Sequence, residues 1–579
     1  MAAKNRRRNR RSVAFPSTSG KSVKKGKGSA DDDDARTAKK EAGDSEGAPR
    51  PLGDTRGRLL ILAVLCAVFF HTPWAGAPRL DQVVYLHQVG QYHTLGDILS
   101  ESPSWHRLHS AGDYILYRPV LFLFLGLQYY FFDYHFALWQ ITGFLLHAGT
   151  VLLFYEVCRK MALSEMWRVL ITLLFGCSFL GSELVIWNHL TGYVLFALCT
   201  MASLNLLLAY LNEGGARLWW SLLFAALASF TYEAGLVYCA IVAAMLLFSR
   251  RRSQAILYFA VPVLYVIFSV LDYQAIFHHL PRASSDEHAP FPGLYAVAVL
   301  IGKQLVFWIG GFLAPAFYEV IPAGRATFAG FRFAPSFWRL LNLASVGLLL
   351  VGALTALFQF QRPKSYRHIW AAAAVLGFLG AYSAIIAVGR SVPRGLAYTL
   401  NSNLYYAYIP VLGLLLACAF LFGQVSGASK AVTFAAGILI VCNASKTFEL
   451  IRGYRYEYSA PRLRLIDQLV RWRHDHEVQS NAFFEIAADC ATTENVAWGG
   501  FRPHLRRGAV WKEPFGVADL LFPDRSYPLN REWLRGANIE KTVIRCGQAA
   551  GGSGPRDRLF DDELEGRIDP PPGGGHSEP

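Results

Sequence analysis

The stretch FALWQITGFLLHAGTVLLFYEV, residues 136–157, decides the fold class of this chain. It is a continuous apolar run, close to the roughly 20 residues that a helix needs to cross a bilayer. Similar runs recur, among them GYVLFALCTMASLNLLLAYL (192–211) and RLLNLASVGLLLVGALTALF (339–358). Their apolar residues do not alternate with polar ones, which argues against a β-barrel. The sequence therefore predicts an all-α polytopic membrane protein.

The composition of the chain agrees with this class. Of its 579 residues, 53% are hydrophobic and only 17% are charged, and the mean hydropathy is +0.27. Much of the net charge of +14 lies in residues 1–58, a polar segment with KNRRRNRR and KSVKKGKG. Such a segment cannot bury enough apolar surface to fold, and it lacks the aromatics that stack on nucleic acid. We predict a disordered basic cytoplasmic tail, not a cleaved signal peptide, and no nucleic-acid partner.

The apolar runs predict about ten to twelve spans. The basic flanks CRKM (158–161), SRRR (249–252) and QRPKSYRH (361–368) are expected on the cytoplasmic side. The run 120–132 is short for a span and is expected to lie along the membrane surface, whereas 294–315 is either a full span or a re-entrant piece. The other spans are predicted near 59–75, 136–157, 167–182, 189–211, 217–232, 234–248, 255–272, 336–358, 369–388, 404–423 and 430–446.

The predicted domain order follows from these spans. A transmembrane domain covers 59–446, with a first outer loop and juxtamembrane helices at 76–135. Residues 447–560 are expected to form a small C-terminal α/β or mixed domain outside the membrane, followed by a disordered tail at 561–579. Cys490 and Cys546 lie in that domain and form a disulfide only if it faces an oxidising compartment. No CxxC or HExxH motif occurs, so no metal and no cofactor is predicted.

Polar residues collect at the predicted outer ends of the spans. Ionisable groups near a bilayer are costly, so each is a candidate functional residue. Arginine matches phosphate oxygens with a planar fork, and a carboxylate can accept the proton of a hydroxyl group. This combination suits a lipid-phosphate substrate. The residues concerned are Asp81, Arg118, Glu183, Asn188, Glu233, Arg390 and Arg394.

Several blocks of the sequence resemble the GT-C superfamily of membrane glycosyltransferases, which includes the protein O-mannosyltransferases and the lipid A aminoarabinose transferase. The first is the acid of the first outer loop, in RLDQVVYL (79–86). The second is YRPVLFLFLGLQYYFF with the span that follows it (117–161), and the third is FGCSFLGSELVIWNHLTGYVLFALC and its continuation (175–211). NSNLYYAYIPVLGLLLA (401–417) is similar to a later motif. The resemblance covers about 59–250 well and 250–446 loosely.

This resemblance implies a function. Its members transfer a sugar from a polyprenyl-phosphate donor to a lipid, glycan or protein hydroxyl on the outer face of the membrane. By position, Asp81 would be the general base, Arg118 would bind the donor phosphate, and Glu183 and Glu233 would be further catalytic acids. The sequence has Leu404 where relatives often have arginine, so Arg390 or Arg394 would supply a second phosphate contact. Further substrate contacts are expected at Asn188, Tyr405 and Tyr406.

Each of these residues also has a purely structural interpretation. Asp81 is a favoured helix N-cap, and Arg118 is a type of residue that snorkels to the membrane surface. Glu183 fits an exposed loop, and Glu233 fits the polar tip of a tight hairpin. Arg390 and Arg394 suit contacts with lipid headgroups.

Two other functions stay open on the sequence alone. One is a lipid or solute transporter or flippase, although no internal repeat is visible and the charges lie at one face. The other is an inactive relative that acts as a scaffold, an alternative left open because Asp81 is followed by Gln82 where relatives often have a second acid. In each case we expect a multi-pass protein of the cell membrane (the inner membrane if the cell is Gram-negative), with a cytoplasmic N-terminus.

Overall fold

In the computed structural model, the described part of the chain consists mainly of helices. The residues described are 51–76, 94–101, 117–132, 135–161, 163–277, 294–321, 325–328, 337–359, 366–387, 404–422, 430–459, 482–486 and 540–544. The chain divides into two units, Met1–Asp54 and Thr55–Pro579, and the helical bundle belongs to the second. Several predictions fall outside the described residues: those for the tail before residue 51, Asp81, Arg390, Arg394, Cys490, Cys546 and 561–579.

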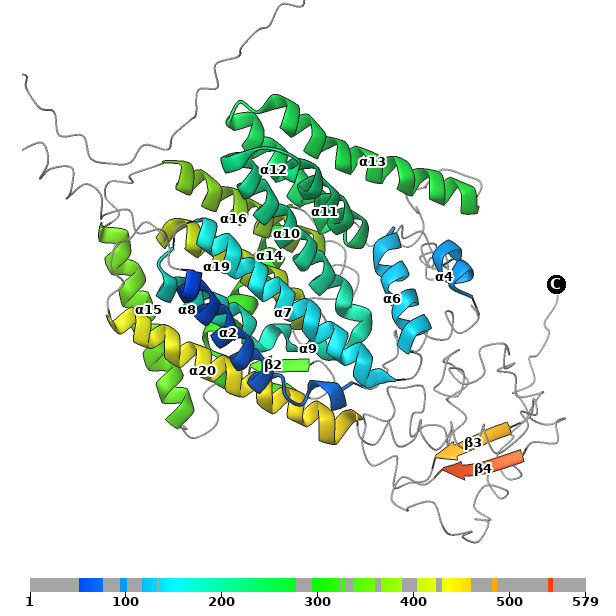
Figure 1. The fold of residues 1–579 in the computed structure, drawn as a ribbon. Coiled ribbons are helices and arrows are strands. Elements are labelled where there is room, and N and C mark those ends of the chain that lie inside the picture. Colours follow the sequence, from blue (N-terminus) through cyan, green and yellow to red (C-terminus); the bar gives the residue numbers. More distant parts are fainter. Residues whose placement is uncertain are drawn as a thin grey trace, which may run out of the picture. The chain divides into compact units, whose positions relative to one another are not determined.

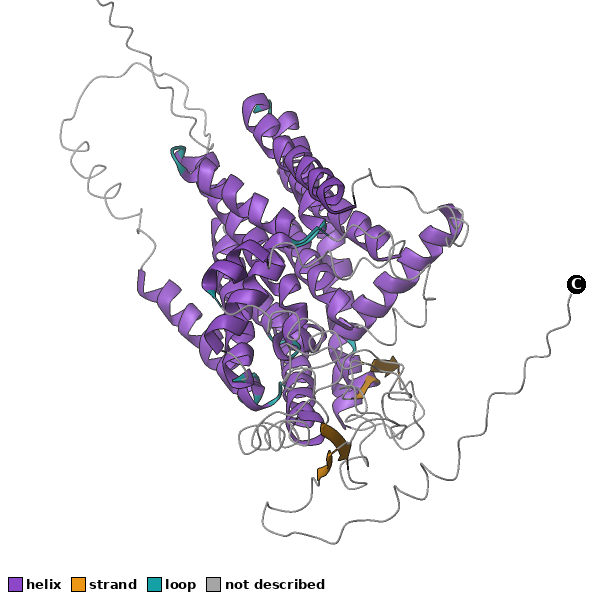
Figure 2. Cartoon of the chain, turned by 90° about the vertical axis from the view of Figure 1, so that its right-hand side faces the viewer, coloured by secondary structure: helices purple, strands orange, loops and turns teal. Residues whose placement is uncertain are grey.

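The described chain is almost entirely helical (Figures 1 and 2). The long helices are α2 (Pro51–Val68), α7 (Phe136–Lys160), α10 (Thr191–Glu213), α13 (Arg252–Phe277), α14 (Leu294–Leu313), α15 (Phe337–Gln359), α16 (Tyr366–Ile386) and α20 (Lys430–Gly453). The shorter ones are α4 (Leu95–Glu101), α6 (Pro119–Phe132), α8 (Glu165–Gly176), α9 (Ser182–Ile186), α11 (Arg217–Thr231), α12 (Ala234–Phe248) and α19 (Tyr408–Phe422). Short turns of 3-10 helix are η1 (Thr72–Trp74), η3 (Phe179–Gly181), η4 (Asn188–Leu190), η5 (Pro315–Phe317) and η7 (Leu404–Ala407), and η8 (Tyr454–Ser459) is a π-helix.

The helices support the predicted multi-pass membrane protein. Within the described residues, six helices are long and apolar enough to cross a bilayer, and a bent pair would make a seventh. Further apolar helices are shorter, including the one at Pro119–Phe132 that we predicted to lie along the surface. Every predicted span overlaps a helix, although the one near 167–182 is interrupted after Gly176, and the count of about ten to twelve spans stays a prediction. The ambiguous run 294–315 is one continuous helix, α14.

The strands are few and short. β1 (Tyr318–Ile321) pairs antiparallel with β2 (Arg325–Phe328) directly after α14. In the C-terminal region, β3 (Ala482–Ile486) pairs in parallel with β4 (Glu540–Ile544). A parallel pair needs a long connection, which the chain between these strands provides. The C-terminal domain that we predicted stays a prediction beyond this pair.

One candidate span is interrupted where α8 ends and η3 begins, with a bend of 46° between Glu165–Gly176 and Phe179–Ile186, as in a broken span or a re-entrant loop. A break inside a membrane frees backbone carbonyls that water cannot reach, so the protein must supply donors. His147 on α7 hydrogen-bonds to the carbonyl of Gly176 through Nε2 (3.0 Å), and Thr447 on α20 donates to the carbonyl of Cys177 (2.9 Å). Ser182 donates to the carbonyl of Phe179 (2.6 Å). Side chains from two neighbouring helices thus stabilise the bend.

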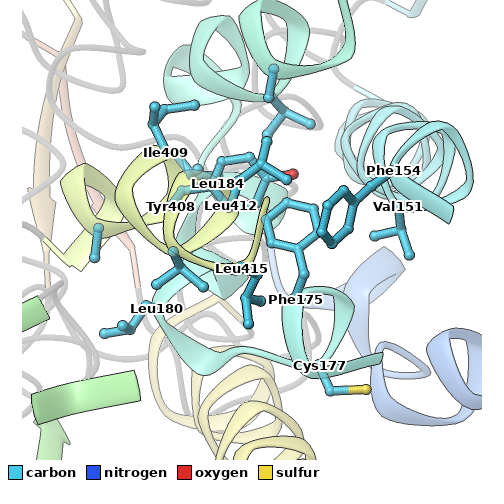
Figure 3. Packing of buried hydrophobic residues seen from close by; sticks show 14 of the residues in the cluster. Val151, Phe154, Phe175, Cys177, Leu180, Leu184, Tyr408, Ile409, Leu412 and Leu415 are labelled. Atoms are coloured by element: carbon cyan, nitrogen blue, oxygen red, sulfur yellow. The ribbon is translucent and has the colours of Figure 1, made fainter. Parts of the chain in front are cut away.

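The largest apolar core surrounds this broken span (Figure 3). Val151 and Phe154 from α7 meet Phe175, and α19 contributes Leu412 and Leu415. Two glycines allow the close approach. A Cβ at Gly181 would lie 2.6 Å from the Tyr408 ring, and one at Gly143 would lie 2.8 Å from the carbonyl oxygen of Val185. α7 and α19 therefore fix where α9 and Glu183 lie.

Antiparallel hairpins bring distant residues to one end of the bundle. α10 packs on both α7 and α11, and the turn between α10 and α11 uses Gly214 and Gly215 at positive φ. The next hairpin, α11 to α12, turns at the opposite end, at Tyr232 and Glu233. Several short helical segments contact one another or the neighbouring helix ends, and they gather at the end of the bundle that carries Tyr232 and Glu233. These segments are η1, η3, α9, η4, η7 and η8.

Candidate functional site

The tip of the hairpin between α11 and α12 carries the first of the predicted acids. α11 ends at Thr231, Tyr232 is extended, and α12 begins at Ala234. Gly235 permits this tight turn, because a Cβ there would lie 2.5 Å from the backbone N and Cα of Ser229. The hairpin therefore holds Glu233 in one place at the end of the bundle.

Glu233 forms a two-pronged ion pair with Arg118. The Nε of Arg118 donates to Oε1 at 2.9 Å and its Nη2 donates to Oε2 at 2.7 Å. Only 14% of the Arg118 side chain and 23% of the Glu233 side chain are exposed. Burial by itself lowers the pKa of Arg118, but the charge and hydrogen bonds of Glu233 outweigh burial and raise the pKa well above its ordinary value. The guanidinium is therefore permanently charged and fixed in orientation.

Tyrosine rings surround this pair. The guanidinium of Arg118 lies 4.5 Å from the centre of the Tyr232 ring, a cation–π distance. The Tyr232 hydroxyl donates to the Tyr193 hydroxyl at 3.1 Å. Tyr193 in turn packs against Tyr405 at 5.5 Å and Tyr406 at 6.0 Å, measured between ring centres. Residues from α10, the α11–α12 hairpin and η7 thus form one aromatic cluster beside the ion pair.

The residue before Arg118 is held by a second set of rings. The Tyr265 hydroxyl on α13 donates to the backbone carbonyl of Tyr117 at 3.0 Å, and the two rings meet edge to face at 5.6 Å. Phe230 packs against both. Burial and the nearby Asp272 carboxylate raise the pKa of the Tyr117 phenol, so it stays neutral. The backbone that carries Arg118 is therefore anchored to α11 and α13.

The second predicted acid, Glu183, lies in the first turn of α9 and is fully buried. The Tyr454 hydroxyl donates to its Oε1 at 2.9 Å, across 271 residues of sequence. The sequence-based alternative of an exposed loop acid is therefore wrong for Glu183. The loop is packed because α7, α19 and α20 close over it, which no local pattern around Glu183 indicates.

Asn188 lies five residues further along, in η4, and is only 1% exposed. Neither side-chain polar atom of Asn188 has a hydrogen-bond partner among the described residues. Its neighbour Trp187 meets Tyr405 edge to face at 6.1 Å. Rings therefore run from Trp187 through Tyr405, Tyr193 and Tyr232 to the Arg118 guanidinium.

The structure thus groups the predicted residues in a definite way. Arg118 and Glu233 form the ion pair, Tyr405 and Tyr406 lie in the aromatic cluster, and Asn188 is beside it. Glu183 is not part of this group and accepts a hydrogen bond from Tyr454. Sequence reasoning missed Tyr193, Tyr232 and His147, and also Tyr382 on α16, whose ring centre lies 6.4 Å from that of Tyr232. A polar or aromatic residue interrupting an apolar run is a usable signal for each.

No group of three or more His, Cys, Asp or Glu side chains in the described part of the chain is arranged to hold a metal ion. What the end of the bundle offers chemically is a fixed cation, carboxylates and aromatic faces. Comparisons with known proteins give no assignment, since no protein-family model matches the sequence and no curated protein matches it.

Proposed function

We propose that this chain is a GT-C-type membrane glycosyltransferase that takes its sugar from a polyprenyl-phosphate donor. The observation that carries the proposal is the Arg118–Glu233 ion pair, set under the Tyr232 ring at the end of a membrane helical bundle. A largely buried charged pair beside membrane spans is costly, so a function is the first explanation for its presence. The resemblance of 117–161 and 175–211 to the superfamily supplies the reaction class.

Arg118 is the proposed phosphate ligand. Glu233 takes the Nε and Nη2 donors of the guanidinium, which leaves the N–H groups of Nη1 for a phosphate oxygen. The group is already oriented by Glu233 and Tyr232, so little conformational entropy is lost when phosphate binds. An arginine in this setting also stabilises the negative charge that grows on the phosphate as the sugar leaves.

The carboxylates then have different roles. Both oxygens of Glu233 are engaged by Arg118, so we assign Glu233 to positioning the phosphate ligand and not to proton transfer. Asp81 is the proposed base. It takes the proton of the acceptor hydroxyl, whose oxygen bonds to the anomeric carbon while the bond from that carbon to the phosphate oxygen breaks. The products are the glycosylated acceptor and polyprenyl phosphate. Glu183 and Asn188 are proposed to orient the sugar or the acceptor.

One observation favours the transporter alternative, the broken span of α8 and α9. Transporters coordinate substrates and ions with backbone groups that such a break leaves without helical hydrogen bonds. Here the carbonyls of Gly176, Cys177 and Phe179 accept hydrogen bonds from protein side chains. The break is therefore stabilised internally. This favours an enzyme whose reaction takes place at the end of the bundle.

The test uses purified protein in nanodiscs with a panel of polyprenyl-phosphate sugars and a panel of acceptors. Release of polyprenyl phosphate is followed over time. We expect release from one donor by the wild type and at least a hundredfold less from Arg118→Gln, the scale of losing a charge-stabilising group in a transition state. Equal release by the two proteins would overturn the role of Arg118. Movement of an intact labelled lipid across the bilayer without cleavage would instead support a flippase.

A further inference from the structure

A second arginine site lies where the first and last candidate spans end. These candidate spans run over Asp54–Trp74 and Lys430–Tyr456, so η1 and η8 lie at the ends of the two spans. η1 contacts η8, and the Ser459 hydroxyl donates to the carbonyl of Ala75. Two segments 384 residues apart in the sequence are thus joined at one edge of the bundle.

Arg455 occupies the centre of this junction. Its guanidinium lies 4.5 Å from the ring centre of Trp74 and 4.8 Å from that of Tyr456. Its Nη1 donates to Nδ1 of His71 at 2.8 Å. Because arginine has no acceptor, Nδ1 of His71 must be the acceptor, which leaves the imidazole proton on Nε2. The guanidinium is thereby held by two aromatic rings and one imidazole.

Arg455 differs from four other arginines of the described chain in that its partners carry no negative charge. Arg58, Arg118, Arg159 and Arg217 each pair with a glutamate. Over the described residues, no carboxylate pairs with Arg455, and Arg452, three positions earlier, is exposed. The junction therefore carries a fixed positive charge, an imidazole N–H donor and, about one helical turn earlier, a second arginine that also lies near His71.

The aromatic residues beside Arg455 place this charge at the membrane surface. Trp74 is 45% exposed, Phe70 is 59% exposed and Tyr456 is 52% exposed. Tryptophan and tyrosine favour the headgroup level of a bilayer, with the ring towards the acyl chains and the polar atom towards water. The anion available in quantity at that level is the headgroup phosphate.

We propose that Arg455, with Arg452 and His71, binds the headgroup of an anionic phospholipid at the junction of η1 and η8. The charge complementarity selects an anionic over a zwitterionic lipid, because a net negative headgroup gains more from two arginines. The site is separate from the Arg118–Glu233 pair and does not depend on the proposed glycosyl transfer. Arg455 follows Tyr454, whose hydroxyl donates to Glu183. A lipid bound at Arg455 would therefore stabilise the position of Tyr454 and, through it, of Glu183.

Native mass spectrometry of the purified protein with a mixture of phosphatidylglycerol and phosphatidylcholine tests this site. We expect Arg455→Gln to retain roughly fivefold less phosphatidylglycerol, with unchanged phosphatidylcholine, the effect of one arginine at a membrane surface. Arg455→Lys should retain an intermediate amount, because it keeps the charge and loses the planar fork. Arg217→Gln is the control, since Arg217 pairs with Glu213 at the start of α11, at the other end of the bundle from Arg455.

A second variant keeps the test decisive if Arg455→Gln does not fold. Trp74→Leu keeps the arginine and removes one of its aromatic faces, so it should lower phosphatidylglycerol retention by a smaller factor. Wild-type retention in Arg455→Gln, or in both Arg455→Lys and Trp74→Leu, would overturn the proposal. Displacement of phosphatidylglycerol by inorganic phosphate, with a phosphate adduct in its place, would also overturn it in favour of a free anion.

Discussion

Arg118 donates two hydrogen bonds to the carboxylate of Glu233, although the two residues are 115 positions apart in the sequence. Arg118 directly precedes α6, and Glu233 lies in the turn between α11 and α12. The ion pair therefore connects α6, which is not one of the candidate spans, to the bundle. Tyr265 adds a second tie through the carbonyl of Tyr117. The position of the proposed phosphate ligand is thus set by three separate elements.

A charge swap separates the structural role of this pair from its proposed role in catalysis. Arg118→Glu places two acids together and should lower the free energy of unfolding by about 3 kcal/mol, the scale of breaking a buried ion pair. The double variant Arg118→Glu with Glu233→Arg should recover much of this stability but not polyprenyl-phosphate release. Thermal unfolding in detergent and the release assay check the two parts. Release at the wild-type rate by the double variant would contradict the assigned orientation of Arg118.

Gly235 should be intolerant of a single methyl group. The Cβ of alanine would lie 2.5 Å from the Ser229 backbone, so the hairpin must open and move Glu233. We expect Gly235→Ala to lower both the unfolding temperature and the release rate. Gly437→Ala is the matched control, because no atom beyond its chain neighbours and the backbone of its own helix lies within 4 Å of a Cβ there, and alanine favours the helix by up to about 1 kcal/mol. Equal behaviour of the two variants would show that the tight turn is not required.

Tyr454→Phe should act through Glu183. The substitution removes the hydroxyl that donates to the buried carboxylate, which should cost about 1–3 kcal/mol of stability and lower the turnover rate. Tyr210→Phe is the control, because it removes a hydroxyl that accepts from Gln254 at the other end of the bundle. It should leave turnover unchanged. A normal turnover rate in Tyr454→Phe would argue against any role for Glu183 in orienting substrate.

His147 should be essential for the broken span. It is buried, with Nδ1 at 2.9 Å from the Tyr408 hydroxyl and Nε2 at 3.0 Å from the Gly176 carbonyl. His147→Ala leaves both groups without this partner and opens a cavity, so we expect a loss of about 3 kcal/mol. Thermal unfolding checks this loss. An unchanged unfolding temperature would contradict the account of how the bend is stabilised.

Much of the helical architecture is predictable from the sequence, because a membrane span must be a continuous apolar run. The run 136–157 corresponds to α7, and 192–211 lies within α10. The pairing of Arg118 with Glu233 was not predictable in the same way. It depends on how α6 packs against α11, which is a long-range contact that no local pattern encodes.

The surroundings of the other candidate residues were also set by packing. Glu183 follows Gly181 and Ser182, small and polar residues that suggest a loop, yet it is buried, and η8, directly after α20, brings Tyr454 onto it. The tyrosine cluster joins Tyr193 of α10 and Tyr232 of the α11–α12 turn with Tyr382 of α16, and each of these residues lies within or beside an apolar run. Composition indicates such residues, and tertiary contacts decide which of them meet.

The most direct test of the central claim is polyprenyl-phosphate release in nanodiscs by four proteins: the wild type, Arg118→Lys, Asp81→Asn and Arg217→Lys. The account predicts release by the wild type and by Arg217→Lys, with a strong loss in Arg118→Lys, which keeps a charge but lacks the fork, and in Asp81→Asn. Wild-type release by Arg118→Lys, or no release from any donor and acceptor pair by the wild type, would contradict it.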